Sequence, residues 1–220
     1  MVHGREHLRR IPESTIRRLP AYLRALQSLK CLRTTSVALG EATGYSSEQV
    51  RKDLAYFGAF GTRGVGYDVH ELGQRIRHIL GLDQGVRAVL VGAGHLGTAL
   101  VRYTQAIAGD VEFVAALDND PEVIGTDIGG IVVEDVRQMA SVVEERAIRL
   151  AVLTVPARAA EATAQDLAKA GIGAILNFAP VPILTDHNPA GSVLVQSIDL
   201  TLELQALAYF VSEHDVFSPA

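Results

Sequence analysis

A buried strand that runs directly into a glycine-rich turn is the feature of this sequence that most restricts its fold. Residues 87–91 read Arg-Ala-Val-Leu-Val, and Gly92-Ala93-Gly94-His95-Leu96-Gly97 follows at once, opening an apolar helix through about residue 107. A second strand over residues 111–117 leads to Asp118, which lies 21 residues after Gly97. This order predicts a dinucleotide-binding Rossmann unit, which consists of a strand, a turn with this glycine spacing, a helix, and a second strand that ends in an acidic residue.

Each glycine of this turn has a separate role in such a unit. Gly92 permits the tight turn, Gly94 lets a pyrophosphate reach backbone amides at the helix N-terminus, and Gly97 lets the helix pack closely. Asp118 is expected to accept hydrogen bonds from adenosine ribose hydroxyls, and the two residues after it supply no cation for a 2′-phosphate. The sequence therefore favours NAD(H) over NADP(H). His95 lies inside the phosphate loop, where a solvent-facing or phosphate-adjacent role is favoured over a catalytic one.

The chain after Asp118 continues to alternate strands and helices. We expect strands near residues 131–133, 150–155, 174–177 and 193–196, with helices near 136–146 and 158–170. This pattern predicts a doubly wound parallel sheet of the α/β class over residues 81–198. Two strands end in the segments Thr154-Val155-Pro156 and Asn177-Phe178-Ala179-Pro180. Ligands bind at the carboxyl edge of such sheets, so both segments are candidates for lining the cofactor, although proline there can also simply end a strand.

The first third of the chain has the pattern of a helix-turn-helix. From Ser14, an apolar stripe recurs at helical spacing through residue 29, and Pro20 is expected to kink or divide this helix. Ser36 is expected to cap a short helix through residue 42, Gly44 supplies a tight turn, and Ser46 or Ser47 caps a second helix over residues 48–57.

The second of these short helices has a distinct outer face. Val50, Leu54 and Phe57 form its buried side. Residues 58–67 carry glycines spaced for a hairpin, as in a wing that lies along a DNA groove. A winged helix over residues 1–80 is therefore predicted, although a helical subdomain with an ordinary glycine loop remains an alternative. The predicted DNA-contacting residues are Ser46, Ser47, Arg51, Lys52, Arg63 and Gly64.

The charges are unevenly distributed along the chain. Residues 1–80 hold 13 Lys and Arg against 7 Asp and Glu, whereas residues 81–220 hold 7 against 18. This imbalance favours a nucleic-acid-facing module joined to an acidic body, although an ordinary solvated surface can produce it too. With 48% hydrophobic and 20% charged residues, the composition is that of a folded protein rather than a disordered one.

Several other classes of protein do not fit the sequence. No apolar stretch approaches the ~20 residues that a membrane span needs, and the charged start lacks the apolar core of a signal peptide. We therefore expect a cytoplasmic protein with no membrane partner. The single cysteine, Cys31, cannot form an intrachain disulfide, and no histidine pair has the helical spacing of metal ligands. No metal site is predicted.

The last helix, from residue 200 to about 211, is apolar around most of its circumference. Such a helix has to be buried on several sides, which a small Rossmann sheet does not provide. We therefore expect residues 199–220 to form a C-terminal helix exchanged between the subunits of a homodimer.

The sequence leaves little room for catalysis. A dehydrogenase needs a substrate domain and an acid or base beside the nicotinamide, yet the sheet and the last helix take up the residues after the winged helix. The ligand-facing loops contain no Tyr-x-x-x-Lys pair and no His-Asp couple. We therefore predict a non-enzymatic cofactor sensor with no catalytic residues. An enzyme with an N-terminal substrate module, and a regulator that binds another nucleotide such as coenzyme A, are the alternatives.

The sequence resembles the Rex family of redox-sensing transcriptional repressors over nearly the whole chain, from about Ile11 to Phe210, and four blocks carry the resemblance. They are Arg51-Lys52-Asp53-Leu54-Ala55-Tyr56-Phe57-Gly58, Gly61-Thr62-Arg63-Gly64-Val65-Gly66-Tyr67, Gly92-Ala93-Gly94-His95-Leu96-Gly97 and Ile175-Leu176-Asn177-Phe178-Ala179-Pro180. The resemblance implies a homodimer in which each winged helix binds half of an inverted-repeat operator. It also implies that each Rossmann domain senses the balance of NADH and NAD+, and that NADH binding releases the DNA.

The resemblance further implies three switch residues, which match Arg24, Tyr103 and Asp199 by position. Without the family, Arg24 would be a solvated charge, Tyr103 a core residue and Asp199 a helix cap. Leu200 stands where some members have a phenylalanine near the nicotinamide, so an aromatic contact at that point is not expected here.

Overall fold

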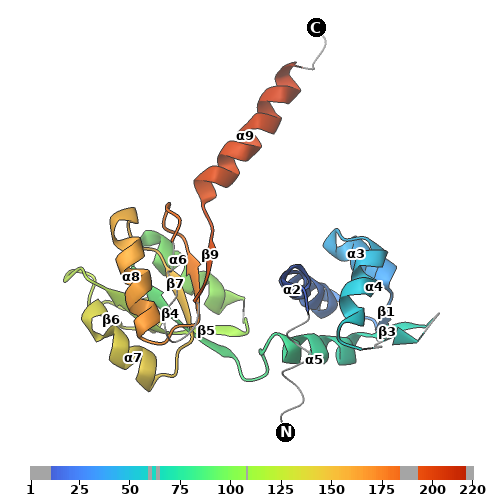
Figure 1. The fold of residues 1–220 in the computed structure, drawn as a ribbon, viewed down its shortest axis with the longest axis horizontal. Helices are drawn as coiled ribbons and strands as arrows, with labels where there is room; N and C mark the ends of the chain where they lie inside the picture. The colour runs from blue at the N-terminus through green and yellow to red at the C-terminus, as the bar shows by residue number, and fades with distance from the viewer. Residues whose placement is uncertain (1–10, 59–60, 63–64, 108, 184–192, 217–220) are drawn as a thin grey trace. The chain divides into compact units, whose positions relative to one another are not determined.

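The computed structural model describes residues 11–58, 61–62, 65–107, 109–183 and 193–216 (Figure 1). The chain divides into two units, Met1–Gln84 and Gly85–Ala220. The division lies slightly after the boundary expected at residue 80, because Leu80 and Leu82 still pack against the core of the first unit.

The first unit combines helices with a small antiparallel sheet. Its helices are α2 (Glu13–Ser28), α3 (Ser36–Thr43), α4 (Ser47–Ala55) and α5 (Val69–Ile79), and its strands are β1 (Arg33–Thr34), β2 (Gly61–Thr62) and β3 (Gly66–Asp68). The strands pair in the order β1-β3-β2. Leu19, Tyr22, Leu39, Leu54 and Ile76 are buried at the centre of the helices. Helices α3 and α4 with the β2–β3 hairpin make the winged helix-turn-helix that the sequence predicts.

Two local details of this unit differ from the expectation: the possible division of the first helix at Pro20, and the cap of α3. Helix α2 continues through Pro20 instead of dividing there. The proline removes one backbone hydrogen bond, but burial of Leu19, Tyr22 and Leu23 on either side of it holds the helix together. Helix α3 is capped by Thr35 and not by Ser36, because Thr35 has the extended backbone of a cap and its Oγ1 accepts the N–H of Ala38 at 3.1 Å.

The second unit is built on a parallel sheet. Its strands are β4 (Val86–Val91), β5 (Val111–Asp118), β6 (Val133–Asp135), β7 (Leu150–Leu153), β8 (Ala174–Asn177) and β9 (Leu194–Ser197). They pair in the order β6-β5-β4-β7-β8-β9, and every neighbouring pair is parallel. This is the strand order of a doubly wound Rossmann sheet, so the predicted fold class is confirmed.

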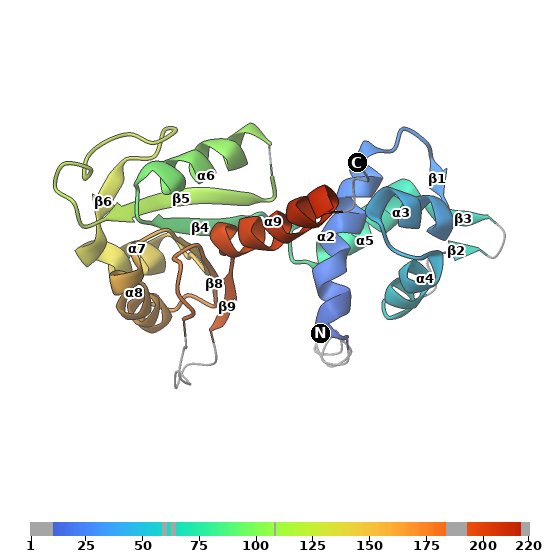
Figure 2. The ribbon, with the colours of Figure 1, turned by 90° about the horizontal axis from the view of Figure 1, so that it is seen from above.

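Helices cover both faces of this sheet (Figure 2). Helix α6 (His95–Ala106) lies on one face, and α7 (Met139–Glu145), which follows a 3₁₀ turn at Val136–Gln138, lies with α8 (Ala157–Lys169) on the other. Alternating strand residues supply two separate apolar cores, as expected for a sheet buried on both faces. The order of strands reverses between β4 and β7, so the turns after these strands meet at the carboxyl edge where such folds bind ligands.

The third strand of the unit begins two residues later than the sequence suggests. Strand β6 starts at Val133, whereas the apolar run was expected to form a strand over residues 131–133. Residues 131 and 132 instead close a local turn, in which Ile128 donates to the carbonyl of Ile131 at 2.9 Å and Val132 bridges Asp127.

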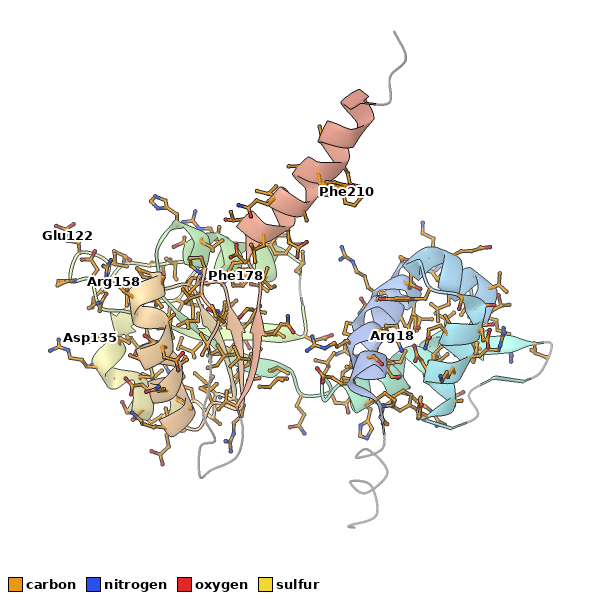
Figure 3. All side chains as sticks on the ribbon, turned by 45° about the horizontal axis from the view of Figure 1, so that its top comes forward. Arg18, Glu122, Asp135, Arg158, Phe178 and Phe210 are labelled. Atoms are coloured by element: carbon orange, nitrogen blue, oxygen red, sulfur yellow. The ribbon has the colours of Figure 1, made fainter. Side chains whose placement is uncertain are left out.

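Helix α9 (Leu200–Val216) follows β9 and is exposed along the part whose side chains are described. Leu204, Leu207, Phe210 and Val211 are each at least 59% exposed, and Phe210 extends into open space (Figure 3). The second unit by itself therefore does not bury this helix. Among the described helices, none has the length and apolar character needed to span a membrane.

Candidate functional site

The glycine turn between β4 and α6 lies at the reversal point of the sheet. Gly92 has a φ of 97°, and a Cβ atom there would lie 2.8 Å from the carbonyl oxygen of Thr154. A Cβ on Gly97 would lie 2.2 Å from the carbonyl oxygen of Gly92, so only glycine lets α6 pack this close to the turn. Around Gly94 nothing lies within 4 Å of such an atom. The turn is therefore tightly packed at both ends and open at its centre, where α6 begins.

Asp118 ties this turn to the end of β5. Its Oδ2 accepts the N–H of Ala93 at 2.6 Å, and its Oδ1 accepts the N–H groups of Asn119 and Asp120 at 2.7 and 2.9 Å. An ionised carboxylate has about four acceptor positions, so Oδ2 keeps one for a further donor. The half-buried side chain thus both shapes the turn and can accept a hydroxyl at the edge of the sheet.

Thr154 holds the turn from the other side. Its Oγ1 donates to the carbonyl oxygen of Gly92 at 2.6 Å, and its backbone N–H donates to Val91 at 2.9 Å. Val155 packs against the core, and Pro156 is exposed at the start of α8. Of this predicted cofactor-lining segment, Thr154 is the residue that contacts the glycine turn through a side-chain hydrogen bond.

The second predicted segment begins at the end of β8. Asn177 is fully buried, and its side chain hydrogen bonds to the chain that follows it. Phe178 is half-buried and packs against the core on the α6 face of the sheet, and its backbone N–H donates to Leu153 at 2.8 Å (Figure 3). Ala179 is buried and Pro180 is exposed. The segment therefore lies beside the end of β7 at the same edge as the glycine turn. His95 and Leu96, the first residues of α6, are exposed there.

The sequence analysis did not identify Arg137 as a cation at this edge of the sheet. Strands β5 and β6 place Asp118 directly opposite Asp135, and Asp135 forms an ion pair with Arg137. The Arg137 side chain holds the pKa of the Asp135 carboxyl at about 2. With Asn119, these two residues line an open pocket of about 450 Å³. Arg137 follows β6 whereas Asp118 ends β5, so the sequence alone does not show that the two strands are neighbours.

In the first unit, the predicted DNA-contacting face of α4 is exposed. Arg51 and Lys52 point outward, and Arg51 donates to the Oγ of Ser36 at 3.1 Å. Ser46 caps α4 through the N–H of Gln49 at 3.1 Å, and Ser47 is half-buried as its first residue. The predicted contacts at Arg63 and Gly64 lie outside the described residues.

The same helix carries a buried carboxylate that the sequence analysis did not single out. Asp53 accepts hydrogen bonds from Arg18 at 2.6 and 2.8 Å, Tyr22 at 2.8 Å, Thr15 at 2.9 Å and Gln49 at 2.9 Å. Burial opposes ionisation of this group, but these donors outweigh it and lower the pKa of Asp53 to about 2. Burial and the hydrogen bond to Asp53 raise the pKa of Tyr22. The network fixes α4 against α2 (Figure 3, where Arg18 is labelled).

The three residues matched to a switch lie on separate elements. Arg24 is exposed on α2, and Tyr103 is 60% exposed on α6, so it is not a core residue of the chain. Asp199 caps α9, since its Oδ1 accepts the N–H groups of Thr201 and Leu202 at 2.9 and 3.3 Å. The part of the chain that the structure describes holds no group of three His, Cys, Asp or Glu residues suited to a metal ion.

Known proteins share this organisation along almost the whole chain. A redox-sensing transcriptional repressor Rex from Natranaerobius thermophilus is 39% identical over 205 residues, which cover 92% of each chain. Its counterpart from Desulforamulus reducens is 42% identical and covers 91% of this chain and 95% of that protein. The chain belongs to the Rex family. Rex proteins are redox-sensing transcriptional repressors, as the resemblance in the sequence implied.

Solved structures agree with this assignment to Rex. A crystal structure of RSP in complex with β-NAD+ and operator DNA matches 94% of this chain and 95% of its own, with a TM-score of 0.84 and 33% identity. RSP in complex with β-NADH matches with a TM-score of 0.79 and 32% identity, over 94% of this chain and 97% of that one. Residues 10–55 match the family described as putative DNA-binding protein N-terminus, and residues 83–181 match the one described as CoA binding domain.

Proposed function

We propose that this Rex protein is a homodimeric repressor that binds an inverted-repeat operator and releases it when NADH binds. One observation carries the proposal: an open glycine turn beside a carboxylate with a free acceptor position, in a chain whose other unit exposes a basic recognition helix. RSP, whose structures include NAD+ with operator DNA and NADH, matches both units together.

The DNA-binding role rests on α4. Its outer face presents Arg51 and Lys52, whose charges suit contacts with phosphates and base edges in a major groove. Ser46 and Ser47 lie at its N-terminus, where backbone N–H groups favour a phosphate. Arg63 and Gly64, which lie outside the described residues, stay predicted contacts on the basis of the sequence. Replacing Lys52 or Arg51 by Ala is expected to weaken operator binding and reduce its salt dependence, with NADH affinity unchanged. Unchanged operator affinity in both variants would refute the assignment of α4.

The cofactor role rests on the edge of the parallel sheet. The open space at Gly94 and the free N-terminus of α6 suit a pyrophosphate, and Oδ2 of Asp118 suits a ribose hydroxyl. The residues that would hold NAD(H) are Gly92, Ala93, Gly94, His95, Leu96, Gly97, Asp118, Thr154, Val155, Pro156, Asn177, Phe178, Ala179 and Pro180. When bound, the cofactor supplies a ring whose charge depends on its redox state.

The preference for NADH follows from that charge. The oxidised ring is cationic, whereas the reduced ring is neutral, and burying an unpaired cation is costly. Phe178 and Leu200 would give the ring an apolar surrounding. Equal affinity for NADH and NAD+ would contradict this part of the proposal.

The dimer rests on exposed apolar surface. Helix α9 leaves its leucines and Phe210 uncovered, and Leu96 and Tyr103 on α6 are exposed together with Ile107, the residue that follows this helix. A second copy that exchanges α9 would cover such surfaces. A monomeric mass in solution would contradict it. Arg24, Tyr103 and Asp199 are then the switch residues whose pairing differs between the DNA-binding and released dimers.

The affinity difference that NADH needs to release the operator follows from two states of the dimer, one open and one closed. An open dimer that matches two major grooves about 34 Å apart binds the operator, and a closed dimer does not. A shift from nearly all open to nearly all closed needs about 5.5 kcal/mol of differential binding, which two cofactors can share.

Fluorescence anisotropy on a labelled inverted-repeat operator tests the function directly. The full-length protein is titrated at fixed salt with NADH, NAD+, NADPH and, because of the match to a CoA binding domain, coenzyme A. Release by NADH and not by the other three supports the proposal. Binding that is indifferent to NADH but is released by coenzyme A would favour that ligand instead.

We also propose that the protein has no enzymatic activity and acts in the cytoplasm, where operator DNA is found. Oxidation of NADH by the protein with carbonyl or quinone substrates would contradict the first statement. Cofactor absorbance at substrate concentrations well above that of the protein gives the measurement.

A further inference from the structure

We infer that Asn177 and Ser197 are positioning residues that couple the cofactor-lining loop to the base of α9. The loop is Phe178–Val181, and the inference rests on the proposed function above. Neither residue needs to contact the cofactor in this role. Each acts by holding two segments together at the carboxyl edge of the sheet.

Asn177 uses its whole side chain to do this. Its Oδ1 accepts the N–H of Ala179 at 2.9 Å, while its Nδ2 donates to the carbonyl of Val181 at 2.9 Å and to Oγ of Ser197 at 3.1 Å. A weaker contact from Nδ2 reaches the carbonyl of Ala179 at 3.3 Å. The side chain is fully buried, so each of these polar groups would be costly to leave unpaired. One amide therefore holds the loop and the end of β9 at once.

The chain from Ser197 to α9 is short and also hydrogen bonded. Ser197 ends β9, and the N–H of Ile198 donates to the backbone carbonyl of Asn177 at 2.8 Å. Asp199 comes next and caps the first turn of α9. Only Ile198 and Asp199 separate Ser197 from Leu200, the first residue of α9, so a displacement of Asn177 is expected to displace the start of this helix.

The side-chain bond adds a link that the sheet itself does not provide. The β8–β9 ladder already aligns Asn177 with Ser197 through the backbone, and it ends there. The loop lies beyond that ladder, and the Asn177 side chain connects it to β9. If the loop moves when NADH binds beside it, the Asn177–Ser197 bond would move the first turn of α9. In the proposed dimer, α9 packs against the other subunit.

The coupling between NADH binding and operator binding can be measured directly. It is the ratio of the operator dissociation constants with and without saturating NADH. Thermodynamic linkage requires that operator DNA change the NADH dissociation constant by the same ratio. Both constants are measured by anisotropy on the full-length protein, and NADH binding to the DNA-free protein is measured from its fluorescence.

Ser197→Ala is the test variant. It removes the acceptor on β9 and leaves every Asn177 bond within the loop in place; Ser197 is exposed, so folding is not at risk. We expect the coupling ratio to fall about fivefold, the factor that one neutral hydrogen bond corresponds to. Operator affinity without NADH and NADH affinity without DNA should both stay within about twofold of the original.

Two further variants make the result specific. Ser197→Thr keeps the hydroxyl and should keep the original coupling. Ser141→Ala removes a hydroxyl that bonds only to Gln138 within the α7 region and should change nothing. A Ser197→Ala protein that couples as strongly as the original would overturn the inference. If the original protein itself shows no response of DNA binding to NADH, the proposed function fails instead.

Discussion

Asp53 and Asp118 are hydrogen-bonded carboxylates in the two units of the chain, and they differ in the groups that donate to them. Asp53 is fully buried, and four side chains from α2 and α4 surround it. Asp118 is half-buried, and three backbone N–H groups at a sheet edge bind it. A carboxylate closed in by side chains can only position a helix, whereas one bound by backbone at an edge keeps an acceptor for a ligand.

The largest expected effect is on the buried member of this pair. Asp53→Ala removes the partner of Arg18 and leaves Tyr22 and Thr15 without their acceptor, so we expect the first unit to lose about 3–5 kcal/mol of unfolding free energy. Chemical denaturation, with hydrogen exchange to locate the loss in α2 and α4, measures it. Glu13→Ala, which breaks an exposed i,i+4 pair with Arg17 on α2, serves as the control and should cost at most about 0.5 kcal/mol.

The pH dependence of the same unit gives an independent check. The pKa of Asp53 is lowered to about 2 in the folded protein, from an ordinary value of 3.8. A lowered pKa means that the carboxylate stabilises the fold fully above about pH 4, and that this contribution is lost as the pH falls toward 2. Asp53→Ala should therefore flatten the acid limb of the stability curve. An acid limb of unchanged slope would show that other carboxylates dominate it.

The success of sequence reasoning differs between these two regions for a physical reason. The glycine turn and Asp118 follow a fixed spacing along one segment, so periodicity and chain order were enough to predict the strand, the turn and the helix. Asp53 depends on Arg18, which lies 35 residues earlier, and nothing in the local pattern of α4 shows that this pair meets. Long-range ion pairs require the packing of the helices to be known first.

The local errors have the same origin. Pro20 was expected to kink or divide α2, but the helix is not divided there, because burial of Leu19 and Leu23 outweighs one missing hydrogen bond. Arg137 was missed because only the order of strands places its partner, Asp135, opposite Asp118. Tertiary contacts, which the sequence does not display, decided each case.

The third prediction concerns the backbone packing of the glycine turn in the Rossmann unit. Gly97→Ala forces a methyl group to within 2.2 Å of the Gly92 carbonyl, so we expect a loss of about 2 kcal/mol in the stability of this unit. Gly94→Ala meets nothing within 4 Å and should leave stability nearly unchanged, while its methyl group weakens NADH binding about tenfold by occupying the place of the pyrophosphate. Thermal unfolding and NADH titration separate the two variants. Equal effects of both on stability would mean that the turn is more open than its geometry indicates.

The fourth prediction tests Asp118 itself. Asp118→Ala should reduce NADH affinity about tenfold and lower stability by only about 1 kcal/mol, because two of the three freed N–H groups belong to the exposed Asn119 and Asp120 and can bind water. Operator binding without NADH should persist. Asp120→Ala is the matched control, since that carboxylate accepts only the N–H of Glu122 and should leave NADH affinity unchanged. An Asp118→Ala protein with the original NADH affinity would remove this residue from the site.

The smallest expected effect is at Arg137. This cation lies at the same edge as Asp118 and would attract a 2′-phosphate if its charge were free, but Asp135 binds it through the two oxygens of its carboxylate. Its charge is therefore already neutralised, and Arg137→Ala should change the ratio of NADPH to NADH affinity by less than about twofold. Asp135→Ala, which frees the guanidinium, should shift that ratio toward NADPH. If Arg137→Ala alone lowered NADPH affinity tenfold, Arg137 and not Asp118 would set the choice of cofactor, and the edge carboxylate would serve only to shape the turn.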